Sequence, residues 1–113
     1  MSLASNGFMQ QTLTMQASSA IDAGAPVKLT GNYTVSPCDA NDAFCGVALS
    51  CREDLCAVQC SGSVTLPYSG TAPEVGFAVL ACDGSGKVKT AESGTNVLIV
   101  AVDTVRGTVT CIL

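Results

Sequence analysis

Hydrophobic and polar residues alternate along much of this chain, and the alternation is clearest over residues 44–67. Every second residue of 45–51 is apolar or cysteine, which is the period of a strand with one buried face. The charged residues 52–54 interrupt the pattern, and it resumes over 56–60 with Cys56, Val58 and Cys60 on the buried side. Two alternating runs around a short charged turn predict a β-hairpin. Gly62 then predicts a sharp bend before a further strand over 63–67.

Shorter alternating or apolar runs predict the remaining strands, at residues 8–16, 26–29, 33–35, 75–81, 87–90, 97–102 and 108–113. Stretches rich in glycine and polar residues separate these runs, as expected for turns. The run 97–102 is the most continuously apolar, and we expect it to be buried on both faces. No run has the 3.6-residue period of an amphipathic helix. The sequence therefore predicts an all-β protein.

The two halves of the chain share one pattern. Valines about 52 residues apart occupy similar places in each half: Val27 and Val79, Val35 and Val88, Val47 and Val100, Val58 and Val109. A chain of 113 residues has the length of one domain. The prediction is a flexible segment over 1–7, then a single small β-barrel domain over 8–113. Its two similar halves are expected to cover each other's apolar faces.

The composition favours a protein that buries surface in an assembly. Hydrophobic residues make up 48% of the chain and charged residues only 12%, and exposed apolar area of this kind is usually covered by partners. The net charge is −4 and the five basic residues are scattered, which argues against a nucleic-acid partner. The chain shows neither a membrane-spanning apolar run nor a signal-peptide pattern, so we expect no membrane partner and no secretion.

No arrangement of residues predicts catalysis, a metal or a cofactor. The chain has no histidine, so no serine can be activated by one. The stretch 83–87 lacks the Ser or Thr that follows Lys in a phosphate-binding loop, and we interpret it as a hairpin turn. Oxygen donors at Asp39, Asn41 and Asp42 suggest calcium, but the closing Glu of a calcium loop is missing. The protein is expected to be non-enzymatic.

Seven cysteines require a separate interpretation. An odd count without a signal peptide argues against a disulfide framework, and the spacings do not match a zinc site. We expect most of these thiols to be small core residues at inward strand positions: Cys45, Cys51, Cys56, Cys60 and Cys111. Of these, Cys45, Cys56, Cys60 and Cys111 are expected to be buried and unbridged. Cys51 and Cys56 flank one turn and could be oxidised by air, and Cys38 is expected to be exposed and reactive.

Several short motifs resemble one family when taken together. They are IDAGAPV at 21–27, CGVAL at 45–49, GSVTLP at 62–67, GFAV at 76–79, DGSGKV at 83–88 and GTVT at 107–110. They resemble the capsid cement, or head decoration, proteins of tailed phages and prophages, over about residues 8–113. The Ile-x-Ala-Gly start also resembles β-clip domains, a fold that includes trimeric head decoration proteins.

This resemblance implies a structural role on the outside of a virion, with no catalytic residues. The implied partners are the major capsid protein and further copies of the chain, as in a trimer. The protein would be made in the bacterial cytoplasm and would not be secreted.

The N-terminal strand is the segment that we expect to contact a partner, because an apolar strand with little chain before it can add to a neighbour's sheet. The residues concerned are Phe8, Met9, Gln10, Thr12 and Thr14. The alternative is that this strand closes the protein's own barrel.

Two other functions fit the pattern less well. A non-enzymatic carrier or ligand-binding module of the lipoyl-like kind would suit the two-hairpin repeat, with Lys87 as its attachment residue, but Lys87 follows the turn and does not lie at its tip. A sugar-binding or enzymatic barrel would need clustered aromatic residues, and the chain has two Tyr and three Phe.

Overall fold

The computed structural model describes residues 11–113, which form strands and turns without a helix. The strands are β1 (Gln11–Ala17), β2 (Pro26–Gly31), β3 (Thr34–Pro37), β4 (Gly46–Arg52), β5 (Leu55–Ser61), β6 (Ser63–Pro67), β7 (Gly76–Cys82), β8 (Val88–Thr90), β9 (Thr95–Asp103) and β10 (Thr108–Ile112). The all-β prediction is confirmed. The flexible segment expected at 1–7 and the strand start expected at 8–10 lie outside the described residues. Within 11–113, no helix is long and apolar enough to cross a bilayer.

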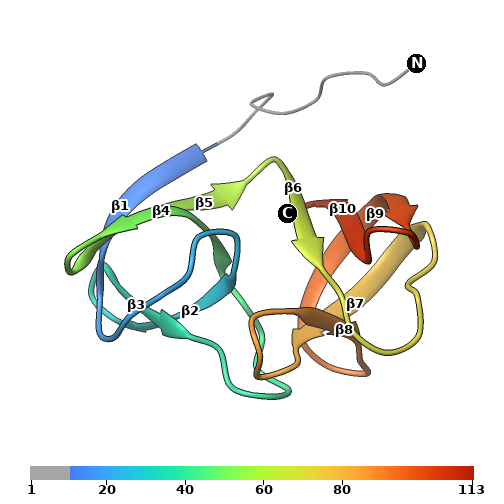
Figure 1. The fold of residues 1–113 in the computed structure, drawn as a ribbon, viewed down its shortest axis with the longest axis horizontal. Coiled ribbons are helices and arrows are strands. Elements are labelled where there is room, and N and C mark those ends of the chain that lie inside the picture. The colour runs from blue at the N-terminus through green and yellow to red at the C-terminus, as the bar shows by residue number, and fades with distance from the viewer. Residues whose placement is uncertain (1–10) are drawn as a thin grey trace.

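The strands form two lobes that lie side by side (Figure 1). The first five strands close a barrel in the order β1-β3-β2-β4-β5, and the other five form a sheet in the order β6-β10-β9-β7-β8. Taken in chain order, strands β1 to β5 correspond to strands β6 to β10. Strands that are neighbours in the first lobe then correspond to strands that are neighbours in the second. Even the parallel contact is repeated, since β1 pairs with β3 in parallel and Tyr68 after β6 bridges Val88 of β8 in parallel. The predicted two-half fold is confirmed.

The valine correspondence holds at two of its four positions. Val35 and Val88 are both fully buried, as are Val58 and Val109. Val79, by contrast, is only half-buried. The register pairs Leu29 with Val35 and Cys82 with Val88, so Leu80 is the structural counterpart of Val27.

One strand differs from its predicted environment. The run 97–102 was expected to be buried on both faces, but in β9 Val97 and Ile99 are buried while Val100 is 47% exposed. Only one face of this strand is turned toward the core of its lobe, and the other face lies at the surface. An apolar run cannot distinguish these cases, because exposed Val and Ala look the same in sequence as buried ones. Val100 is therefore not the structural counterpart of Val47, which is buried.

Each lobe encloses a core of its own. The barrel core consists of Met15, Val27, Val35, Ala48, Cys56 and Val58. The core of the second lobe combines residues of that lobe with Cys38, Phe44 and Val47 from the first half of the chain. The expected covering of one half by the other is therefore carried by these three residues. The strand β4 lies between the two cores, since Val47 packs into one and its neighbour Ala48 into the other.

The loop between β3 and β4 joins the lobes through hydrogen bonds of its backbone to β7 and β9. Asn41 N donates to Cys82 O at 2.8 Å, and Cys82 N donates to Asp42 O at 2.9 Å. Phe44 N donates to Thr95 Oγ1 at 2.9 Å, and the same hydroxyl donates back to Phe44 O at 2.8 Å. The loop both donates hydrogen bonds to β7 and β9 and accepts hydrogen bonds from them. These bonds fix the loop against the second lobe and hold the two lobes together.

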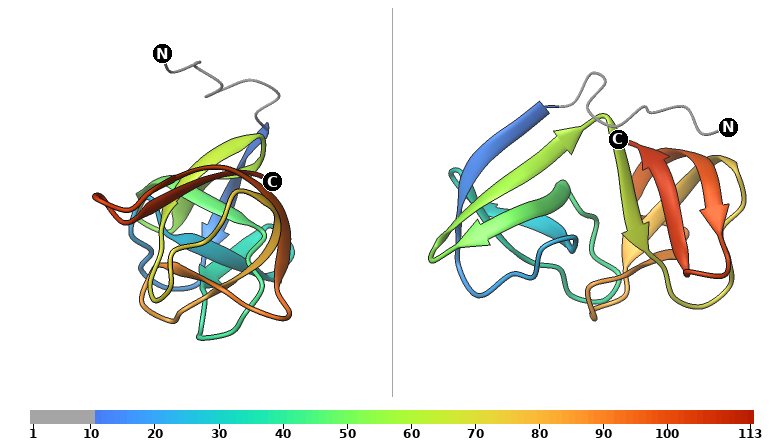
Figure 2. Two further views of the ribbon diagram at one scale, coloured as in Figure 1. Left: turned by 90° about the vertical axis from the view of Figure 1, so that its right-hand side faces the viewer. Right: turned by 45° about the horizontal axis from the view of Figure 1, so that its top comes forward.

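The chain passes between the lobes a second time at the bend from β5 to β6, which is visible in Figure 2. Gly62 takes a φ of 93° there, as its predicted role in a sharp bend requires. Gln59 Nε2 donates to Ser61 O at 3.1 Å and to Ser63 O at 2.8 Å across the bend. Gln59 is only 4% exposed although its neighbour Val58, on the opposite face by strand alternation, is also buried.

Replacing Gly46 by Ala should destabilise the fold. A Cβ at this position would lie 2.5 Å from Gln59 O and 2.9 Å from Val58 Cγ1, so β4 would have to move away from β5. We expect Gly46→Ala to lower the free energy of unfolding by about 1–3 kcal/mol, measured by urea denaturation. Gly31→Ala is the control, since its Cβ would meet Thr34 at an ordinary 3.5 Å. Equal stability of the two variants would contradict the packing described here.

Candidate partner-binding surface

The strand expected to contact a partner is part of the protein's own barrel from Gln11 onward. β1 pairs with β5 along its length, with Leu13 opposite Val58 and Thr14 opposite Ala57. Thr12 and Thr14 are exposed on the wall of this barrel. Phe8, Met9 and Gln10, the other three residues of the prediction, lie outside the described residues.

The other edge of β1 is covered for only part of its length. β1 pairs with β3 through Gln16 and Ala17, and Gln16 N donates to Tyr33 O at 2.7 Å. Toward its N-terminus, β1 continues past the turn between β2 and β3. In the described part of the chain, no strand pairs with this edge at Thr14. Uncovered strand edges are common sites for adding a strand from another chain.

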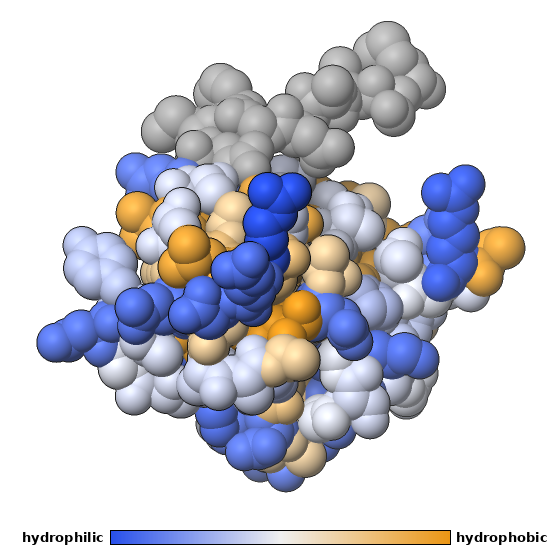
Figure 3. Space-filling model, turned by 60° about the vertical axis from the view of Figure 1, so that its left-hand side comes forward, coloured by the Kyte–Doolittle hydropathy of each residue, from blue (hydrophilic) through white to orange (hydrophobic). Residues whose placement is uncertain are grey.

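An apolar hollow of about 560 Å³ opens beside this edge. We call it the barrel groove, and it is lined by Leu13, Met15, Leu29, Gly31, Asn32 and Tyr33. All six residues are uncharged. Figure 3 brings the barrel side of the molecule forward and shows apolar patches set between polar side chains.

The position of the groove follows from the pleat of the strands around it. Met15 belongs to the barrel core, and Leu13 projects to the same side two residues earlier, where it is 45% exposed. Likewise Val27 is fully buried and Leu29, two residues later, is 57% exposed. The groove therefore begins where the barrel core ends.

Tyr33 forms one wall of the groove and is held by a tight turn. It takes a φ of 50° in the two-residue connection between β2 and β3. Thr34 Oγ1 donates to Asn32 O at 2.9 Å across the same turn. A non-glycine residue in this left-handed conformation is uncommon, and here it leaves the aromatic ring 68% exposed.

A second apolar surface lies on the other lobe. Phe77 of β7 is 90% exposed and Val75 just before it is 67% exposed. They line a shallow hollow of about 480 Å³ that also includes Glu74. Sequence reasoning missed Leu29, Tyr33 and Phe77 as surface residues. The signal available in the sequence was the residue type, because large apolar side chains in or beside short strands are usually buried either in the core or against a partner.

Two of the three oxygen donors that suggested calcium, Asp39 and Asp42, form ion pairs with a lysine. Lys28 Nζ lies 2.8 Å from Asp42 Oδ2 and 3.1 Å from Asp39 Oδ2. The hydrogen bond with Asp42, followed by the one with Asp39, raises the pKa of Lys28, and the same bond with Lys28 holds the pKa of Asp42 below its usual value. Among residues 11–113, no group of three or more ligating side chains is arranged to hold a metal.

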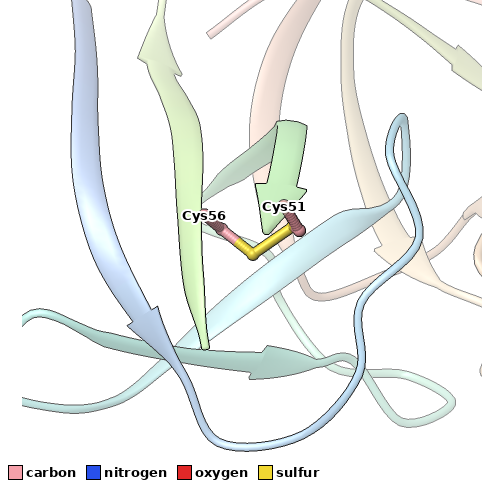
Figure 4. The surroundings of a disulfide bond; sticks show 2 residues. All are labelled: Cys51 and Cys56. Carbon is pink, nitrogen blue, oxygen red and sulfur yellow. A yellow bond between two sulfur atoms is a disulfide. The ribbon is translucent and has the colours of Figure 1, made fainter. Parts of the chain in front are cut away.

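Cys51 and Cys56 form a disulfide between β4 and β5 (Figure 4). They are directly opposite in the register, with Cα atoms 4.1 Å apart, beside the two-residue turn at 53–54. The prediction that Cys56 is unbridged is wrong, and the oxidation considered for this pair is present in the structure. Adjacency across a hairpin is enough to bring the two sulfur atoms together.

The other thiols divide into buried and accessible groups. Cys111 is buried as predicted, and burial raises its pKa to about 11. Cys60 is half-buried and Cys45 is exposed, so the predicted burial of these two is wrong. Cys45 lies between Phe44 and Val47, which both pack into the second core, but its own side chain is exposed.

The exposure expected for Cys38 is also wrong, whereas its reactivity stays a prediction. Cys38 is buried because its loop packs into the second core. A hydrogen bond with Cys82 lowers the pKa of Cys38 and raises that of Cys82.

Lys87 closes the base of a turn. Asp83 N donates to Lys87 O at 3.0 Å, and Lys87 N donates to Asp83 Oδ1 at 3.1 Å. The tip of this turn is formed by residues 84–86. A carrier domain that presents its lysine at the tip of a hairpin is therefore not matched by this geometry.

Comparison with known families agrees with the resemblance seen in the sequence. A family model described as phage cement protein matches residues 4–112. The chain belongs to the phage cement protein family. No match was found among curated proteins. The family is a structural one, and membership supports a role as a phage structural protein.

The exposure of the thiols in this cement protein predicts their order of reaction. In the native protein, Cys45 should be alkylated by iodoacetamide before Cys38, Cys82 and Cys111, which are buried. Peptide mapping by mass spectrometry over a time course measures this order. In urea with reductant, all seven cysteines should react at similar rates. Labelling of Cys38 as fast as Cys45 in the native protein would contradict the packing of the loop between β3 and β4.

Proposed function

We propose that this protein binds the outside of an assembled phage capsid as a homo-oligomer, such as a trimer, and cements the lattice of the major capsid protein. The observation that carries this proposal is membership of the cement family over nearly the whole chain. The protein would act in the virion after synthesis in the bacterial cytoplasm. It would use contact area, without chemistry, to hold neighbouring capsid subunits.

The surface of the two lobes supports this function. Large apolar side chains are exposed on both, and apolar surface on a small protein is typically buried against a partner. The side chains concerned are Leu13, Leu29, Tyr33, Leu49, Leu55, Val75, Phe77, Val100, Val105 and Ile112. With few charges in the chain, shape and apolar area would supply most of the binding free energy.

Within this function, residues 8–14 are the segment that we assign to contacts between molecules. Phe8, Met9 and Gln10 precede β1, while Thr12 and Thr14 lie on its exposed face. The two parts have different roles in the fold. Removal of residues 2–10 leaves the paired residues of β1 and β5 in place, whereas removal up to Thr14 takes away four of the six residues of β1 that pair with β5.

Deletion of residues 2–10 tests the proposal. The shortened protein should keep its β-sheet circular dichroism spectrum and should no longer form oligomers or co-sediment with capsids. Suitable capsids are undecorated shells assembled from the major capsid protein of the same phage or prophage. Light scattering after gel filtration measures the oligomer.

A double variant gives the matched control, because Phe8→Ser with Met9→Ser keeps the chain length and removes only the apolar side chains. It should behave like the deletion. Full-length protein that fails to bind undecorated capsids would overturn the cement function. A deletion variant that still binds would place the contact on the lobes themselves.

A further inference from the structure

The two lobes provide an internal comparison at the edge of the barrel groove. Leu13 lies opposite Val58 in the first lobe, and Leu66 lies opposite Val109 in the second. Since Val58 and Val109 are counterparts in the repeat, Leu13 and Leu66 are counterparts too. Leu66 is fully buried, but Leu13 is 45% exposed. The first lobe thus leaves open a position that the second lobe covers.

We propose that the barrel groove binds the N-terminal segment, residues 3–9, of a second copy of this chain, which adds as a strand beside β1. This inference rests on the oligomer of the proposed function and names the site that the segment occupies. The occupant would cover Leu13 of the first lobe from a second molecule, whereas Leu66 at the matching position is buried within one chain.

The backbone of β1 is oriented to receive such a strand. Gln16 N donates to Tyr33 O and Ser18 N donates to Val35 O, so even-numbered residues present their N–H groups toward β3. Ala17 N donates to Asp54 O, on the side of β5. The alternation along a strand then directs the N–H and C=O of Thr14 toward the open edge. An added strand would hydrogen-bond to these groups.

The segment and the groove also match in chemistry. Residues 1–10 contain no charged side chain and include the apolar Leu3, Phe8 and Met9. The groove is uncharged, with Leu29 and Tyr33 exposed on one side and Leu13 on the other. In strand addition, the main chain provides affinity and alternate side chains enter pockets. The aromatic ring of Phe8 or the thioether of Met9 would fill the hollow.

The same chain cannot place Phe8 beside Thr14 at its own groove. Gln11 is paired with Ser61 of β5, and Phe8 precedes it by three residues. To bring Phe8 beside Thr14, the chain would have to reverse direction at Gln11 itself, which would break this pairing. A Phe8 side chain in the groove beside Thr14 therefore belongs to a second molecule.

Photo-crosslinking of the full-length protein tests this assignment directly. A benzophenone amino acid replaces Phe8, and unlabelled protein is mixed with ¹⁵N-labelled protein before irradiation. We expect crosslinks from position 8 to Leu13, Leu29 or Tyr33 that join one labelled and one unlabelled chain. Crosslinks within a single chain, or to surfaces outside the groove, would overturn the inference.

A pair of variants provides the second measurement. Leu29→Asp places a charge in the groove at a residue that is already 57% exposed, and Asn96→Asp places one at an exposed residue of β9 on the other lobe, outside the apolar surfaces named above. We expect Leu29→Asp to raise the dissociation constant of the oligomer about tenfold or more, as the loss of one apolar anchor implies. Asn96→Asp should leave the dissociation constant unchanged. Circular dichroism establishes that both variants are folded.

The outcomes separate this inference from the function on which it rests. If the unmodified protein is monomeric in solution and on capsids, the proposed oligomer fails as well. If oligomers form and bind capsids while Leu29→Asp has no effect, only the groove assignment fails. Crosslinks from position 8 to the major capsid protein, without any between copies, would show a different occupant and would also overturn it.

Discussion

The placement of β4 between two hydrophobic cores is the constraint on which the rest of this structure depends. Val47 packs into the core of the second lobe and Ala48 into that of the barrel, so a single strand contributes to both. Gly46, on the same strand β4, allows β5 to approach closely because it has no side chain. Because cores of small domains are packed without spare volume, the position of β4 fixes where each lobe stands relative to the other.

The joint built around β4 explains why two similar halves are not equivalent. The loop leading into β4 belongs to the first half by sequence, yet it contributes Cys38 and Phe44 to the second core. The second lobe therefore receives cover from the first, and Leu66 is fully buried, whereas Leu13 at the matching position is exposed. A repeat in sequence gives a repeat in strand order, but each copy's surroundings depend on which neighbour lies against it. Our proposal for the barrel groove follows from this difference.

A protein that works by contact area needs stable lobes and uncovered apolar surface at the same time. The lobes are held by closed or nearly closed strand pairing and by hydrogen bonds made in both directions at the joint. The apolar side chains left outside, such as Leu29, Tyr33 and Phe77, sit on strands or tight turns whose backbone is fixed. Such preorganised surfaces lose little conformational entropy on binding, which suits a protein that must attach to a preformed lattice.

The sequence by itself determined the local order of this protein. Period-2 alternation located the hairpin of β4 and β5, Gly62 predicted the bend, and the spacing of the valines revealed two similar halves. The tertiary structure alone decided which face of each strand was covered. In the structure Cys45 and Val100 are exposed, whereas Cys38 and Gln59 are buried. The burial of each residue depends on contacts between segments that are distant in the chain, and the local pattern does not contain these contacts. The position of the groove was decided by the tertiary structure for the same reason, since the groove forms where β1 runs past a turn that lies elsewhere along the chain.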